Sequence, residues 1–351
     1  WSLYWLTSFH GFLETLEISS LPFFLWPCHV RNGEEEKERK PKKSDSSLNQ
    51  PSLTRRSLFK GLGAGVTLSA FFGPAGSSKE SKEGKKRGVS KGRIKQSVVS
   101  WCFADHWSVQ ETCNQAKRLG CQSIELIDSK DWNTLKEYDL TCAISGIPVE
   151  GKPFIKGFNN PDYHGWLTQA TKQAIDESAD FGCPNVIAFT GYEENFSLED
   201  GAKNCVQGFK KIASHAEKKG VTICLEMLNT RDGSDPNKGH PGYQGDHIDY
   251  CLDIVRRVGS PRVKLLFDIY HVQIMDGDVI RRIGECADYI GHVHTAGNPG
   301  RGELDNNQEI NYPPIMQALL DIGYDGFVGQ EFIPTRDPVI GLTEAVELCD
   351  V

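Results

Sequence analysis

From residue 95 onward, two patterns of hydrophobic and polar positions alternate along the chain. Short β-rich apolar runs, which we predict to be strands, are separated by stretches of helical periodicity. The predicted strands are Gln96–Phe103, Ser123–Ile127, Leu140–Ile147, Asn185–Thr190, Val221–Leu228, Val263–Ile269, Tyr289–Thr295 and Gly326–Phe332. The helical stretches include Tyr163–Phe181, Leu198–Lys219, His247–Val258, Val279–Cys286 and Pro314–Ile322. Eight β/α units within residues 95–351 predict a (β/α)8 TIM barrel.

Glycine follows several of the predicted helices, as at Lys219-Gly220 and Val258-Gly259. Glycine readily adopts the left-handed backbone conformation that ends a helix, so these positions support the predicted boundaries. An open doubly wound sheet is the alternative fold, because it shows the same alternation of strands and helices. It is less favoured, since no predicted strand is followed by a Gly-x-Gly-x-x-Gly turn.

The segment before residue 95 lacks this alternation and divides into three parts. Residues 1–52 form an extension whose apolar stretch is broken by Pro22 and Pro27. It contains no run of the roughly 18–20 apolar residues that span a bilayer. We assign this extension no role and expect it to be disordered or removed by processing. Residues 79–94 are rich in Ser, Lys and Gly, which predicts a flexible linker.

Residues 53–78 have the three-part pattern of an export signal. The basic head Leu53-Thr-Arg-Arg-Ser-Leu-Phe-Lys60 precedes the apolar stretch Gly61–Gly73, and small residues follow. The head resembles the twin-arginine signal, which directs export of proteins already folded around a cofactor. We therefore predict export to the periplasm, with a cytoplasmic location as the alternative.

Charge divides the chain at almost the same place. Residues 1–93 carry 16 Lys and Arg against 9 Asp and Glu, whereas residues 94–351 carry 23 against 38. The predicted barrel therefore has a formal net charge of −15, within a whole-chain value of −8. Because nucleic acids are polyanions, this acidic part argues against a nucleic-acid partner. We expect a small molecule as the partner and leave open whether the chain forms a homo-oligomer.

The eleven cysteines show no Cys-x-x-Cys pair or other zinc-finger spacing. Several lie inside predicted strands or helices, among them Cys102, Cys142, Cys224 and Cys251. Such cysteines are expected to be free thiols that pack as small apolar residues. The odd total also argues against a fully paired disulfide framework.

Four successive predicted strands end in residues that can bind a metal ion. These residues are Glu226, Asp268, His294 and Glu331. Catalytic groups of TIM barrels lie at the carboxyl ends of the strands. Neighbouring strands are about 4.8 Å apart, so we expect the four side chains to converge on one spot.

Three carboxylates in one place repel one another and raise each other's pKa, and a divalent cation removes this cost. Three oxygen ligands and one imidazole suit Mn²⁺ or Mg²⁺, and Co²⁺ or Zn²⁺ can also be accommodated. We therefore predict that Glu226, Asp268, His294 and Glu331 bind one divalent metal ion.

Three further residues lie in the predicted strands or in the loops that follow them. His292 is one alternation before His294 on the same predicted face, and we interpret it as a group that orients a ligand. His240, in the loop after Val221–Leu228, is a candidate substrate contact. Glu125 either forms a salt bridge inside the barrel or contacts the substrate, and the sequence leaves both interpretations open.

Several motifs resemble those of hydroxypyruvate isomerase and its relatives in the xylose-isomerase-like TIM barrel superfamily. They are Leu225-Glu-Met-Leu-Asn-Thr-Arg231, Phe267-Asp-Ile-Tyr-His-Val-Gln273, Gly291-His-Val-His-Thr-Ala-Gly-Asn-Pro-Gly-Arg301, Glu309-Ile-Asn-Tyr-Pro313 and Gly329-Gln-Glu-Phe332. The resemblance covers nearly all of residues 95–351. It implies the metal ligands Glu226, Asp268, His294 and Glu331, with Glu226 and Glu331 as the paired acid and base. It also implies that His271 and Arg301 contact the substrate.

The expected activity is the aldose–ketose isomerisation of a small hydroxy-carbonyl compound such as hydroxypyruvate. A metal that chelates a carbonyl and the neighbouring hydroxyl acidifies the C–H bond and stabilises an enediolate. One carboxylate would remove the proton and the other would return it, although a hydride shift would use similar ligands. The alternatives are a ketose 3-epimerase or an inosose-type dehydratase, then an abasic-site nuclease, and last a non-catalytic sugar-binding barrel.

Overall fold

The structure is a computed structural model that describes residues 88–351. The predicted extension 1–52, the predicted export signal 53–78 and the linker residues 79–87 lie outside the described residues. Their roles therefore stay predictions.

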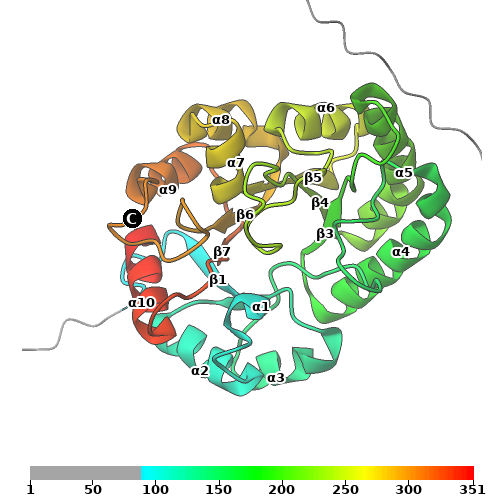
Figure 1. Ribbon diagram of the computed structural model, residues 1–351. Coiled ribbons are helices and arrows are strands. Elements are labelled where there is room, and N and C mark those ends of the chain that lie inside the picture. Colours follow the sequence, from blue (N-terminus) through cyan, green and yellow to red (C-terminus); the bar gives the residue numbers. More distant parts are fainter. Residues whose placement is uncertain (1–87) are drawn as a thin grey trace, which may run out of the picture. The chain divides into compact units, whose positions relative to one another are not determined.

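Parallel strands and helices alternate through the described residues (Figure 1). The strands are β1 Lys95–Val99, β2 Ser123–Glu125, β3 Asn185–Phe189, β4 Thr222–Glu226, β5 Val263–Asp268, β6 Ile290–Thr295 and β7 Phe327–Gln330. The helices are α1 Ser100–Phe103, α2 Val109–Leu119, α3 Trp132–Glu137, α4 His164–Phe181, α5 Leu198–Lys219, α6 Ile248–Val258, α7 Ile269–Met275, α8 Val279–Glu285, α9 Tyr312–Asp321 and α10 Pro338–Cys349. Three short 3₁₀ turns, η1 Ser129–Asp131, η2 Pro161–Tyr163 and η3 Ala287–Tyr289, precede α3, α4 and β6.

The strands form one curled sheet in the order β2-β1-β7-β6-β5-β4-β3, and the helices surround it (Figure 1). Every strand pairing is parallel. Because β1 lies between β2 and β7, the first and last strands of the barrel are neighbours. The predicted TIM-barrel fold is thus confirmed, and the open doubly wound sheet is not observed.

The predicted strand Leu140–Ile147 is wrong as a regular strand, yet this segment closes the barrel between β2 and β3. It forms two isolated parallel bridges, Ser123 with Thr141 and Ser145 with Val186. The amide of Ile124 donates to the Thr141 carbonyl at 3.1 Å, and that of Leu126 donates to Ile144 at 3.0 Å. Three steps on this segment therefore oppose two steps on β2. One extra residue interrupts the ladder, as in a β-bulge.

The predicted first strand also extends too far. β1 ends at Val99, and residues 100–103 form the short helix α1. The apolar pattern misled the prediction because Cys102 and Phe103 are buried although they are helical. As a result Trp101 lies at the carboxyl end of β1, on the rim of the barrel, and not inside a strand.

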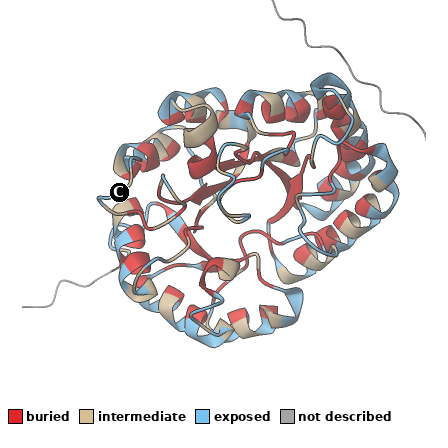
Figure 2. Cartoon of the chain, viewed as in Figure 1, coloured by how far each residue is buried: buried red, intermediate tan, exposed pale blue. Residues whose placement is uncertain are grey.

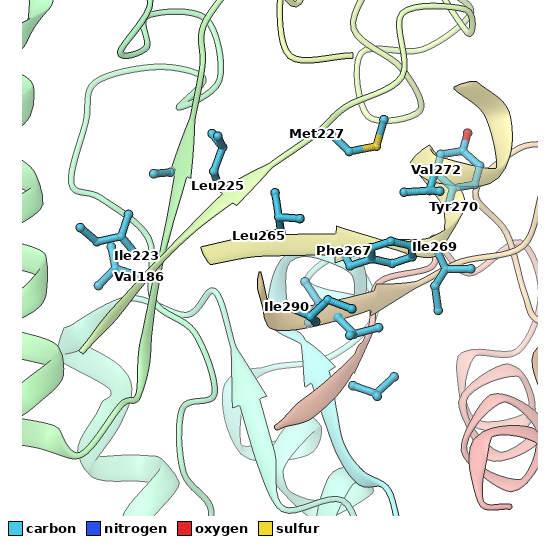
Figure 3. Close-up of a cluster of buried hydrophobic side chains, with 14 of the residues drawn as sticks. Val186, Ile223, Leu225, Met227, Leu265, Phe267, Ile269, Tyr270, Val272 and Ile290 are labelled. Atoms are coloured by element: carbon cyan, nitrogen blue, oxygen red, sulfur yellow. The ribbon is translucent and has the colours of Figure 1, made fainter. Parts of the chain in front are cut away.

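The two faces of the sheet have different chemistry. Residues such as Leu225, Leu265 and Phe267 point outward into the main hydrophobic core, which lies between the strands and the helices (Figure 3). The alternate residues point inward, where Cys224 and Leu266 belong to a separate apolar cluster. Figure 2 shows that the strands and the inner faces of the helices are buried. The sheet is therefore covered on both sides, as parallel sheets usually are.

The helix ends follow the local sequence. The glycines after α5 and α6 have φ values of 73° and 73°, in the left-handed region, which confirms the helix ends predicted there. The ten cysteines of the described residues are free and buried, as predicted for apolar packing. Among the helices of residues 88–351, none is sufficiently long and apolar to span a membrane.

The last residues of the predicted linker pack against the end of α10 and are not a free tether. Asp350 follows α10, and its carboxylate accepts the backbone N–H groups of Ser90, Lys91 and Gly92 at 2.6, 2.7 and 2.8 Å. Ile94 is 3% exposed and joins the main core. These contacts tie the start of β1 to the carboxyl end of the barrel chain.

We expect Asp350→Asn to lower the free energy of unfolding by about 2 kcal/mol at neutral pH, because a carboxylate that accepts several N–H bonds is lost. Burial opposes ionisation of Asp350, but the N–H bonds from Lys91, Ser90 and Gly92 prevail and hold its pKa below the usual value. The stabilisation is therefore present above the ordinary Asp pKa of about 3.9 and is lost as the pH falls through the lower folded value. Urea unfolding at several pH values measures it. Asp105→Asn, at an exposed position, is the control.

Candidate metal centre

Strand register brings the four predicted ligands to one level at the carboxyl end of the barrel. Asp268 of β5 and His294 of β6 are direct register partners. Glu226 is the last residue of β4. Glu331 directly follows β7, and its backbone N–H donates to the Thr295 carbonyl at 2.9 Å. Each of the four side chains points inward because the side chains of a strand alternate between its faces.

The four side chains form one compact group. Each offers a ligand atom, and these atoms all lie within 4.8 Å of one another. All four residues are buried, the most exposed being Glu331 at 4%. The structure therefore brings together Glu226, Asp268, His294 and Glu331, which the sequence predicted to meet.

Several atoms that face the centre of this group have no hydrogen-bond partner. Glu226 Oε1, Asp268 Oδ2 and His294 Nδ1 are all buried and unpaired in the described structure. His294 Nδ1 lies 2.8 Å from Glu331 Oε2 and 3.7 Å from Glu226 Oε1, without the alignment of a hydrogen bond. Unpaired buried polar atoms are costly unless they have a partner. Converging lone pairs from three carboxylates and one imidazole fit a divalent cation.

Asp268 is positioned by the helix that follows it. Its Oδ1 caps α7 by accepting the N–H groups of Tyr270 at 2.8 Å and His271 at 3.4 Å. This fixes the carboxylate and leaves Oδ2 toward the centre. The sequence Asp268-Ile-Tyr-His thus supplies both a ligand and a helix cap.

Arg301 is the counter-charge of the centre. Its Nη2 lies 2.6 Å from Glu331 Oε2 and 3.6 Å from Asp268 Oδ2. Its guanidinium also lies over the rings of Trp101 and Tyr270, at 5.3 and 5.6 Å from their centroids. Predicted as a substrate contact, Arg301 does line the cavity beside the centre, but its strongest contact is with Glu331.

The three carboxyl groups have different electrostatic environments. Burial, with the charge of Glu331 second, raises the pKa of Asp268 to about 7. Burial also raises the pKa of Glu226, which His294 offsets only in part. Burial opposes ionisation of Glu331 as well, but Arg301 and His294 together hold its pKa well below the usual value. Without a cation, Glu331 is therefore the carboxyl group of the three that ionises most readily.

The other predicted residues occupy different places. His271 Nδ1 accepts the backbone N–H of Asn229 at 3.1 Å, and His271 Nε2 lies 3.5 Å from Asp268 Oδ2. His271 is therefore beside a ligand and is not part of the cavity wall. His240 does line the cavity, where its ring lies 4.2 Å from that of Phe154. Burial, then the charge of Arg301, lowers the pKa of His240 to about 4, so it is neutral at physiological pH.

In the described residues, His292 forms no hydrogen bond with any of the four candidate ligands. Its Nε2 lies 3.1 Å from Glu125 Oε1, and the same oxygen lies 2.9 Å from His294 Nε2. Of the two interpretations of Glu125, the structure shows the ion pair inside the barrel. All three residues are 0% exposed.

A cavity of about 450 Å³ opens beside the centre. Glu226, Glu331, Arg301 and His240 form its polar end. The rest of its wall is largely apolar and includes Leu126, Trp132, Ile147, Phe154, Phe189 and Leu228. A buried pocket with a few converging polar groups is the usual form of a small-molecule site.

Two contributors to the site were missed by sequence reasoning. Trp101 Nε1 donates to Glu331 Oε1 at 3.2 Å. It was missed because the first strand was predicted to continue through residue 101. A tryptophan just after a barrel strand could have indicated a side chain at the active-site rim. Asn229 holds His271 and the loop carbonyl of Lys238 through its side chain, at 2.8 Å each. Its position, three residues after the predicted ligand Glu226, could have indicated that it lies beside the site.

Fold and site together define a TIM-barrel protein with a buried acidic centre suited to a divalent cation. The family model of the xylose isomerase-like TIM barrel matches residues 113–348. The chain therefore belongs to the xylose isomerase-like TIM barrel family, and the resemblance seen in the sequence is confirmed.

Curated relatives of the chain carry the names of isomerases. The 2-oxo-tetronate isomerase of Cupriavidus necator is 38% identical over 130 residues, which cover 37% of this chain and 47% of that protein. The hydroxypyruvate isomerase of Escherichia coli (strain K12) is 31% identical over 147 residues, which cover 42% of this chain and 54% of that protein. The chain spans about half the length of these two relatives.

A solved structure agrees with the fold. The crystal structure of the AP endonuclease, family 2, from Brucella melitensis has a TM-score of 0.61 and is 26% identical in sequence. The similarity covers 71% of this chain and 97% of that chain.

We expect Arg301→Met to lower the stability of the metal-free protein by about 3–5 kcal/mol, because Glu331 and Asp268 would stay buried without their counter-charge. Denaturant unfolding measures this loss. Arg336→Met is the matched control, since Arg336 forms more exposed ion pairs with Asp305 and Glu344. Such pairs contribute at most about 1 kcal/mol. Equal losses in the two variants would contradict the assigned role of Arg301.

Proposed function

We propose that this chain is a divalent-metal-dependent isomerase of a small hydroxy-carbonyl compound, similar in activity to hydroxypyruvate isomerase. One observation carries the proposal. Glu226 and Glu331, from β4 and from the end of β7, both lie on the cavity wall and within one cluster with Asp268 and His294. The isomerase names of the relatives support it.

Glu226, Asp268, His294 and Glu331 would hold the cation, with Mn²⁺ or Mg²⁺ favoured by the oxygen-rich ligand set and Co²⁺ or Zn²⁺ as alternatives. When bound, such a cation acts as a Lewis acid that polarises a substrate carbonyl. The other ring nitrogen of His294, Nε2, lies 2.9 Å from Glu125 Oε1. Arg301 and Trp101 fix the two oxygens of Glu331 at 2.6 and 3.2 Å.

The chemistry of this chain's own residues is a proton transfer between neighbouring carbons. One of the two glutamates removes the proton from the hydroxyl-bearing carbon next to the carbonyl, and the other delivers a proton to the former carbonyl carbon. The hydroxyl proton passes to the former carbonyl oxygen, so that the two functional groups exchange places. The fixed orientation of Glu331 suits it for one of these steps. Glu226 Oε1 has no hydrogen-bond partner in the described structure and is free to take the other. His240 lies on the same wall as a contact for a substrate hydroxyl.

A ketose 3-epimerase is the second candidate, and the cavity favours it. A volume of about 450 Å³ leaves room for a substrate larger than a three-carbon acid. Among the lining residues outside the four candidate ligands and Arg301, Asp128 and Glu177 are acidic and Lys152 is basic. This acidic balance suits a neutral ketose better than an acid. An abasic-site nuclease is not proposed, because residues 94–351 carry a net charge of −15, which repels DNA.

Export is also part of the proposal. It rests on the sequence pattern of residues 53–78, which lie outside the described structure. It would bring the barrel to the periplasm with its metal already bound. A homo-oligomer is also left as a prediction.

Removal of metal tests the proposed function. Chelation is expected to abolish turnover and to lower the melting temperature, because a cation that binds only the native state stabilises it by mass action. Mn²⁺ or Mg²⁺ should restore both. The metal-loaded protein is then assayed against hydroxypyruvate, 2-oxo-tetronate, ketohexoses and inosose, which separates the candidate activities. No turnover of any of these by protein shown to contain metal would refute the proposal.

Glu331→Gln is expected to fold and to lose turnover by roughly 10²–10⁴-fold, because an acid/base group is removed. The rate at saturating metal measures the loss. Glu303→Gln is the control, since Glu303 is buried and bonds to Thr335 and Arg336 outside the cavity wall. In D₂O the wild-type product should gain deuterium at carbon, whereas product without deuterium would indicate a hydride shift. Full turnover by Glu331→Gln would show that Glu331 is not the acid/base.

A further inference from the structure

Glu125 lies next to the candidate metal centre, and one of its oxygens accepts hydrogen bonds from two imidazoles. Its Oε1 lies 2.9 Å from His294 Nε2 and 3.1 Å from His292 Nε2. Its Oε2 has no hydrogen-bond partner in the described residues. Residue and partners are completely buried, so the carboxylate must be matched by hydrogen bonds from the protein.

This contact fixes which nitrogen of His294 faces the cluster. Because Nε2 is directed at Glu125, Nδ1 is directed at Glu331 and Glu226, at 2.8 and 3.7 Å. An imidazole can bind a metal only through a nitrogen that carries no proton. A carboxylate that accepts Nε2–H keeps the proton on that side and leaves the Nδ1 lone pair for the cation.

The barrel interior leaves room for Glu125 to reach across two strands. Glu125 ends β2, whereas His294 lies on β6, and β1 and β7 lie between them in the sheet. Gly329 of β7 is the register partner of both His294 and Ser97 of β1. A Cβ atom at Gly329 would lie 1.9 Å from Glu125 Oε1. Only glycine therefore leaves space for the carboxylate in this position.

Glu125 has no access to the substrate. Glu125, His292 and His294 are absent from the cavity wall, whereas Glu226 and Glu331 lie on it. Its effect on the reaction must therefore pass through His294. His292 donates to the same oxygen and so restrains the position of the carboxylate.

We propose that Glu125, restrained by His292, is a positioning residue that orients His294 for metal binding. This inference rests on the proposed metal site. It assigns a role to Glu125, which is not one of the four proposed ligands. The role predicts an effect on metal affinity, with little effect on the reaction once the metal is bound.

The test is a titration of metal-free, full-length protein with Mn²⁺ by calorimetry. Glu125→Gln keeps the shape of the side chain and removes the charge, and it is expected to raise the Kd for Mn²⁺ by about 10–100-fold. At saturating Mn²⁺ its kcat should approach that of wild type, whereas Glu331→Gln stays slow. Asp350→Asn is the matched control. The Asp350 carboxylate is also buried, but it bonds to Ser90, Lys91 and Gly92 and to none of the four candidate ligands, so the Kd should be unchanged.

The double variant Glu125→Leu, His292→Leu guards against a failure of Glu125→Gln to fold. Replacing a buried polar pair by apolar side chains of similar size is often neutral for stability. His294 still loses its acceptor, so the Kd for Mn²⁺ should rise as in the single variant. An unchanged Kd in the folded variants would overturn the positioning role.

The metal content separates two further outcomes. Glu125, His292 and His294 also lie close enough together to bind a cation themselves. Two Mn²⁺ per wild-type chain, falling to one in Glu125→Gln, would show that Glu125 is a ligand and overturn the positioning role. Wild type that binds one Mn²⁺ but converts no substrate would refute the proposed function and leave this inference standing. Wild type that binds no Mn²⁺ would refute both.

Discussion

The burial of three carboxylates beside one another is the constraint on which the site depends. Glu226, Asp268 and Glu331 come from separate strands, and each would be ionised in water. Inside the barrel their charges repel and are poorly solvated. Arg301 neutralises part of this charge, and the remaining unpaired oxygens favour a divalent cation. The candidate metal site is thus a consequence of how the acidic strand ends are packed.

The neighbours of this centre are arranged so that each ligand has one fixed orientation. A helix N-terminus holds Asp268, an indole and a guanidinium hold Glu331, and a buried carboxylate holds His294. Fixed ligands lose little conformational entropy on binding, which favours both affinity and a defined reaction geometry. The apolar side of the cavity is built differently, from side chains that restrict size and exclude water. The polar groups of the candidate metal site and the side chains that limit the size of a ligand therefore lie on different parts of the wall.

The sequence predicted those features that depend on local periodicity. Apolar runs of strand length, each ending in a polar residue, were sufficient to place Glu226, Asp268, His294 and Glu331 at one edge of the predicted barrel. The prediction failed where a buried apolar run is not a regular strand. Cys102 and Phe103 are apolar and buried, yet helical, and residues 140–147 are apolar and extended, yet interrupted by an extra residue.

By itself, then, the sequence determined the barrel, the family and the residues of the candidate metal site, because strand alternation and strand ends follow from short-range sequence patterns. Only the tertiary structure decided which partners those residues have. Glu125 meets His294 across 169 positions of sequence, and Trp101 meets Glu331 across 230. Such pairings depend on strand order and on the space left by Gly329. No pattern within a single segment encodes them, because they arise only when the barrel closes.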